Sequence, residues 1–158
     1  MDDTLKTAIK RRSLIWEAMG ESQYPKTRPL LTLEQFFLHS NGEADLWYNL
    51  PDAPKGQSQY DFHKAIRERA NVWDLRISVT QLDEEPALTA ETFESTWFEW
   101  PNSDHTLIVT TADEGEIRSW FPENAQPDEI DIGERSGTEW GAPSFVPKGY
   151  HQVWLWYD

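Results

Sequence analysis

The sequence contains no cysteine. This absence excludes disulfide bonds, thiolate-bound zinc and cysteine nucleophiles together. A chain without cysteine is compatible with a reducing compartment, so we expect a cytoplasmic protein.

Long hydrophobic runs are also missing. No stretch approaches the roughly 20 apolar residues that a membrane-spanning helix needs. The acidic residues Asp2 and Asp3 are not followed by the apolar region of a signal peptide. We therefore expect no membrane partner.

Positive charge is scarce in the second half of the chain. Residues 1–79 carry 11 Lys+Arg and 11 Asp+Glu, whereas residues 80–158 carry 3 Lys+Arg and 17 Asp+Glu, so the whole net charge of −14 lies there. Nucleic acids bind to arrays of lysine and arginine, which excludes them as expected partners. A basic protein is a better electrostatic match, and an acidic surface that serves only solubility is the alternative.

The local signatures of several enzyme classes are absent. The sequence has no G-x-S-x-G, P-loop or G-x-G-x-x-G motif, so serine esterases, NTPases and dinucleotide-binding proteins lack their signature. A calcium loop starting at Asp128 fails because Ile130 and Ile132 would occupy ligand positions. We expect no metal and no cofactor, and the sequence assigns no catalytic residue.

Aromatic residues are abundant. Nine tryptophans and seven phenylalanines supply apolar area for a core although the hydrophobic content is only 38%. At 158 residues, the chain is expected to form a single domain over residues 1–158. Within it we expect a helical N-terminal extension over residues 1–43 and an α+β core over residues 44–158.

Residues 105–121 give the clearest local signals. The apolar run 107–109 predicts a buried strand. Thr111 and Glu114 have the spacing of a capping box for a following helix, as do Thr32 and Gln35 earlier in the chain. Helical spacing then predicts one inward face, formed by Ile117, Trp120 and Phe121.

The order of elements from residue 44 predicts a ferredoxin-like fold. Strands are expected at 44–50, 73–82, 105–111 and 151–157, and helices at 58–70 and 112–121. This split β-α-β order predicts a four-stranded antiparallel sheet with two helices on one face, and the 44–50 and 105–111 strands in its centre. The other face would present Trp47, Ile108, Trp154 and Trp156 to either residues 30–38 or a second copy in a homodimer.

This topology predicts one group of strand-end polar residues. The parallel 105–111 and 151–157 strands would start about 10 Å apart, which places His105, Asp104 and His151 at one end of the sheet. Histidine and aspartate side chains can transfer protons or bind metal, but this separation is too wide for direct chelation. Histidines that are hydrogen-bonded to loops are the alternative. Four further residues are candidates for a pocket wall, with core packing as the alternative: Trp97, Glu99, Trp100 and Trp140.

Three segments carry a resemblance: Leu31–Phe37 (LTLEQFF), Trp100–Asp104 (WPNSD) and Leu155–Asp158 (LWYD). In this order they resemble a group of small acidic bacterial proteins, mostly uncharacterised, over residues 31–158. By analogy with small acidic proteins that bind secreted toxins, the resemblance implies an immunity-type role and transfers no site residue. The first hypothesis is therefore a non-catalytic module that docks a basic partner. The alternative is a small-ligand-binding protein or enzyme with a tryptophan-rich pocket in the C-terminal half.

Overall fold

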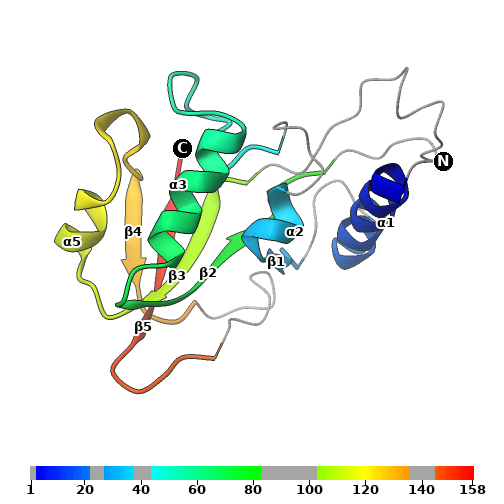
Figure 1. Ribbon diagram of the computed structural model, residues 1–158. Coiled ribbons are helices and arrows are strands. Elements are labelled where there is room, and N and C mark those ends of the chain that lie inside the picture. Colours follow the sequence, from blue (N-terminus) through cyan, green and yellow to red (C-terminus); the bar gives the residue numbers. More distant parts are fainter. Residues whose placement is uncertain (1–2, 22–26, 38–43, 83–102, 136–144) are drawn as a thin grey trace.

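A computed structural model describes residues 3–21, 27–37, 44–82, 103–135 and 145–158 (Figure 1). It confirms the predicted α+β class. The elements are α1 (Asp3–Ala18), β1 (Leu30–Leu31), α2 (Leu33–Phe37), α3 (Gln57–Arg67), β2 (Val72–Ser78), β3 (His105–Thr110), α5 (Glu114–Ser119), η1 (Glu123–Ala125), β4 (Glu129–Ile132) and β5 (His151–Trp156).

The strands form one antiparallel sheet in the order β1-β2-β3-β5-β4. Its central strand β3 has six buried residues, in agreement with the buried strand predicted there. Helix α3 lies across one face of the sheet, and α5 lies beside β4 (Figure 1). The side chains that face the helices alternate along the strands, as a pleated sheet requires. They include Leu75, Ile77, Ile108, Val153 and Leu155.

The predicted ferredoxin-like arrangement is wrong in one of its two central strands, the strand expected at residues 44–50. Residues 44–50 form no strand of the sheet, and β5 instead pairs directly with β3. Two contacts replace the strand pairing. The Asp45 carboxylate accepts the backbone N–H of Trp47 (2.8 Å) and turns the chain, and the side chain of Gln59 on α3 accepts the Leu46 N–H (2.6 Å). Trp47 then packs among the aromatic rings of Phe62, His63 and Tyr157.

The central part of the face opposite α3 is buried as well. Leu107 and Trp154 there are 0% and 1% exposed within a single chain, whereas Trp47 and Ile108 lie on the helical side. Residues 30–37 do not supply the expected cover, since β1 extends the sheet and α2 packs against α3 and β2. A homodimer through this face stays a prediction, and the burial of these side chains reduces the apolar area available for it.

Helix starts are fixed by specific side chains. At α2 the predicted capping box is confirmed, because Thr32 Oγ1 accepts the Gln35 N–H (3.1 Å) and Gln35 Oε1 accepts the Thr32 N–H (2.9 Å). At α5 the N-cap is Asp113, whose Oδ1 accepts the Glu116 N–H (2.8 Å), so the prediction of Thr111 is wrong by two residues. The predicted inward residues Ile117, Trp120 and Phe121 are buried.

Removal of the Asp113 cap should destabilise the protein measurably. We expect Asp113→Ala to lower the free energy of unfolding by about 1 kcal/mol, the usual cost of losing an N-cap. Thr111→Ala is the matched control, because Thr111 is exposed and is not the cap; its effect should stay within about 0.5 kcal/mol. Urea unfolding measures both values, and a larger loss for Thr111→Ala would contradict this assignment.

Candidate functional site

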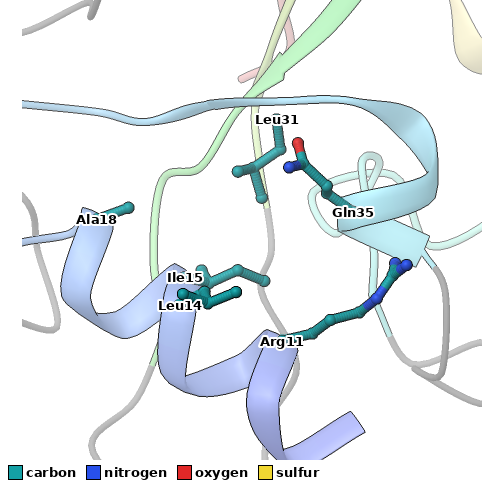
Figure 2. A pocket seen from close by; sticks show the side chains of 6 residues that line it. All are labelled: Arg11, Leu14, Ile15, Ala18, Leu31 and Gln35. Carbon is teal, nitrogen blue, oxygen red and sulfur yellow. The ribbon is translucent and has the colours of Figure 1, made fainter. Parts of the chain in front are cut away.

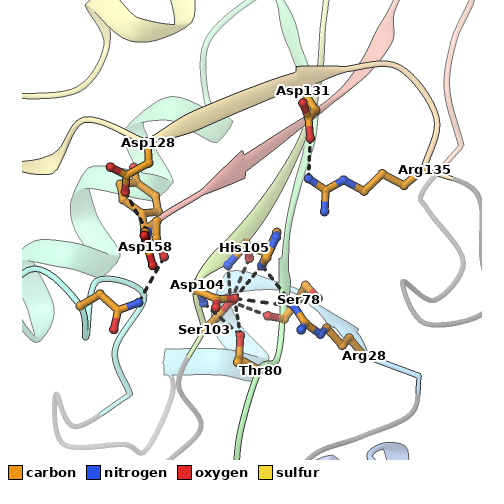
Figure 3. A network of polar contacts seen from close by, with 12 residues as sticks. Arg28, Ser78, Thr80, Ser103, Asp104, His105, Asp128, Asp131, Arg135 and Asp158 are labelled. Atoms are coloured by element: carbon orange, nitrogen blue, oxygen red, sulfur yellow. Dashed lines mark hydrogen bonds and ion pairs between the residues drawn. The ribbon is translucent and has the colours of Figure 1, made fainter.

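A polar network at the start of β3 brings together two of the predicted site residues (Figure 3). His105 Nδ1 lies 2.6 Å from Asp104 Oδ1. Thr80 donates its hydroxyl to the same carboxylate oxygen (2.7 Å) and accepts the Asp104 backbone N–H (3.0 Å). Arg28 Nη1 lies 3.7 Å from Asp104 Oδ1, so a cation from the N-terminal part of the chain completes the network.

Ser103 fixes the backbone beneath this network. Its fully buried hydroxyl hydrogen-bonds to the Ser78 carbonyl on β2 and accepts the His105 backbone N–H (3.1 Å). The hydroxyl therefore joins β2 to β3. These backbone contacts hold it as a structural group, so the arrangement is not a serine nucleophile activated by histidine.

The protonation state follows from the surroundings of Asp104. Burial opposes its ionisation, but hydrogen bonds from His105 and Thr80 and the charge of Arg28 outweigh this effect and hold the pKa of Asp104 below its usual value. Since the carboxylate is charged, His105 Nδ1–H is the donor in their contact. The Arg28 guanidinium, although 3.2 Å from Nδ1, must then direct its N–H groups to acceptors.

The His105 ring is also held from the side. It stacks on Trp156 of β5, with 6.3 Å between ring centroids and 29° between planes. An imidazole whose Nδ1–H is held by a carboxylate has a defined tautomer and orientation, which is the requirement for a proton-transfer group. Geometry thus permits proton transfer here.

The other predicted histidine lies at the opposite end of the sheet. His151 is opposite Thr110 on β3, whereas His105 is opposite Trp156. At about 3.4 Å per residue, the two histidines are roughly 17 Å apart along the strands, so the predicted grouping is wrong. His151 Nε2 instead donates to the Ala112 carbonyl (2.7 Å), as in the alternative of a loop-bonded histidine.

Four of the predicted site residues cannot be placed relative to Asp104 and His105. Trp97, Glu99, Trp100 and Trp140 lie outside the described residues. Among the residues that the structure describes, no three His, Asp or Glu side chains lie close enough together to hold a metal ion. The described part of this candidate site therefore consists of Asp104 and His105, to which the structure adds Arg28 and Thr80.

A second charged feature runs along one side of the molecule. Helix α5 and β4 lie on this side (Figure 1), η1 comes between them in the chain, and β4 ends the sheet. We call the acidic residues of this segment the acidic edge; all are exposed, and they are Asp113, Glu114, Glu116, Glu123, Asp128, Glu129, Asp131 and Glu134. The two arginines of residues 113–135 already pair within the segment, Arg118 with Glu114 (3.1 Å) and Arg135 with Asp131 (2.8 Å).

Only part of these features could be predicted from the sequence. The uneven charge was evident from composition, but its position along α5, η1 and β4 depends on the fold. Arg28 was missed because it lies in a loop 76 residues before Asp104 and has no periodic signal.

Comparison with known proteins gives a family match. Residues 9–155 match the model of the Uncharacterized protein YfbO family. The Uncharacterized protein YfbO of Escherichia coli (strain K12) is 34% identical over 153 residues, which cover 96% of this chain and 99% of the relative. No solved structure matches. The predicted resemblance to an uncharacterised bacterial family is thus confirmed. In the described part of the chain, no helix combines the length and apolar character that a membrane crossing requires.

Proposed function

The chain belongs to the Uncharacterized protein YfbO family, and from that premise we propose that it is a non-catalytic binding module whose acidic edge docks a basic protein. The observation that carries the proposal is the acidic edge itself. Its eight acidic side chains are exposed, and both arginines of the segment are already paired. A basic surface is the complement of such an edge.

The charges of the acidic edge would act mainly on the rate of association with the partner. Charges at the rim of an interface raise the association rate and make it sensitive to salt, because screening extends over about 8–10 Å at physiological ionic strength. The more specific form of the proposal is an immunity-type role, in which the basic partner is a secreted toxin domain. The small size and the acidic edge support this form.

Charge reversal on the acidic edge tests the docking proposal. We expect Glu123→Lys/Glu129→Lys to weaken the binding of a basic partner at least tenfold at low salt, equivalent to about 1.4 kcal/mol, and thereby to reduce its recovery from native lysate. The control Glu17→Lys/Glu21→Lys makes the same change in net charge at exposed positions of the N-terminal segment. Affinity capture at low and high salt, followed by mass spectrometry, identifies what each variant retains.

The control separates a docking surface from bulk charge. A partner that is retained by the control, lost by the edge variant and depleted by salt supports the proposal. Equal losses for both variants would attribute capture to net charge alone. Recovery that does not change with salt or with either variant would remove the electrostatic basis of the proposal.

A second candidate function is ligand binding with proton transfer at Asp104 and His105. The specific observation in its favour is their 2.6 Å contact beside Trp156. In a small-molecule screen by thermal unfolding, a ligand of this site should stabilise the wild type and lose that effect in His105→Gln, because binding stabilises only the state that contains the site. His151→Gln is the matched control at another strand end. Loss of stabilisation in both variants, or in neither, would count against this site.

A further inference from the structure

A groove lies between α1 and the β1–α2 segment, at the end of the sheet away from β4 (Figure 2). Its volume is about 420 Å³. Six residues line it: Arg11, Leu14, Ile15, Ala18, Leu31 and Gln35. We propose that this groove binds a small carboxylate with an apolar body, such as the anion of a medium-chain fatty acid.

Most of the groove wall is apolar. Leu14, Ile15 and Ala18 share one face of α1, because residues three and four apart are neighbours on a helix. Ile15 and Leu31 are buried, whereas Leu14 is 54% exposed. An apolar ligand would cover Leu14 and remove its surface from water, which is favourable.

The polar lining consists of hydrogen-bond donors. Arg11 Nη1 donates to the Glu34 carbonyl (2.8 Å), which ties the guanidinium to α2 and leaves further N–H groups on the same fork. Gln35 Oε1 is engaged by the Thr32 N–H in the capping box, so the Gln35 amide offers its NH₂ group. Figure 2 shows both side chains on the α2 side of the groove.

This donor set selects the chemistry of the ligand. A carboxylate accepts hydrogen bonds from a guanidinium at two oxygens, and a charged pair of this kind is stronger than a neutral one. None of the six lining residues is acidic, so a cationic ligand finds no counter-charge there. The ligand must bring the acceptors and the negative charge.

The size of the groove favours a small molecule. Its volume lies in the range of about 300–1,000 Å³ that is usual for small-molecule pockets. A stable protein partner buries about 800 Å² on each side, which is far more than six residues present. Because β1 and β4 end the sheet on opposite sides, this proposal does not depend on docking at the acidic edge.

Calorimetric titration of the full chain with decanoate tests the proposal, and decanol serves as the neutral ligand of the same length. We expect decanoate to bind at least tenfold more tightly than decanol, because hydrogen bonds to charged groups exceed neutral ones by about this factor. Arg11→Met keeps the apolar stem and should weaken decanoate binding at least tenfold. Lys10→Met removes a cation from the next, exposed position outside the groove and should leave binding unchanged.

A second variant tests whether the apolar part of the ligand occupies the groove. Ala18→Phe, at an exposed position of the wall, should abolish decanoate binding by filling the groove, while circular dichroism confirms that the protein is folded. The proposal is overturned if decanoate does not bind, if decanol binds equally well, or if Arg11→Met and Lys10→Met have the same effect. A dimeric mass in light scattering together with no decanoate binding would assign the groove to a second copy instead.

Discussion

Gln59→Leu is expected to lower the free energy of unfolding by about 4 kcal/mol, because it leaves several buried polar groups without partners at about 1–3 kcal/mol each. Gln59 is fully buried in α3. Its amide accepts the Leu46 N–H (2.6 Å) and donates to Asp45 Oδ1 (2.8 Å) and the Pro54 carbonyl (3.2 Å). One side chain thus holds the turn-rich segment 44–56 against the helix.

Gln57→Leu is the matched control for this experiment. It makes the same chemical change two residues away, where Gln57 is exposed and bonds only to Asp61 on its own helix among the described contacts (3.0 Å). Its effect should stay within about 0.5 kcal/mol. Urea unfolding gives both values, and near-equal losses would show that the segment 44–56 is held by other contacts.

Acidification should destabilise the protein by about 3 kcal/mol between pH 6.5 and pH 4, through a single buried histidine. His63 is 1% exposed among aromatic rings. Its burial lowers its pKa from 6.5 to about 4, although the contact between its Nδ1 and the Gln59 carbonyl (2.8 Å) acts in the opposite direction. Between these two pH values the unfolded chain binds a proton that the folded chain does not, so stability is full above pH 6.5 and falls below it.

His63→Leu identifies the source of this pH dependence. Urea unfolding at pH 7.5, 5.5 and 4.5 should show a decline in the wild type that is much smaller in the variant. Glu34 acts in a lower window, since its pair with Arg67 lowers its pKa to about 2 and its contribution is lost only below pH 4.5. An identical decline in both proteins would exclude His63 as the cause.

The parts of the fold that were predicted correctly from the sequence depend on residues that are close together in the chain. The strand at Leu107–Val109, the inward face at Ile117 and the cap at Thr32 all arise from contacts within a few positions. The predicted strand at 44–50 failed because its alternation was overridden by Gln59, which lies on a helix further along the chain. β4 was missed because its alternation of Ile130 and Ile132 with acidic residues spans only four positions, in an irregular stretch between Pro127 and Gly133.

In the candidate site, too, the contact between neighbouring residues could be predicted, whereas contacts that depend on strand order could not. Asp104 and His105 are adjacent in sequence, so their contact needed no knowledge of topology. The grouping with His151 failed because it assumed that strand 44–50 separates two parallel strands, whereas β3 and β5 are antiparallel neighbours. Arg11 of the groove gives no local signal in the sequence, and only the position of α2 shows its hydrogen bond to the Glu34 carbonyl.

The position of β5 between β3 and β4 also constrains the order of folding during synthesis. β4 leaves the ribosome before β5, yet β5 is the only strand in the described sheet with which β4 pairs. Until residues 151–156 have emerged, Glu129–Ile132 has no neighbour, and β3 has one unpaired edge. Unpaired strand edges of this kind can pair with other chains and aggregate. The eight exposed acidic side chains of residues 113–135 would therefore also protect the nascent chain, because they repel other copies of the same chain.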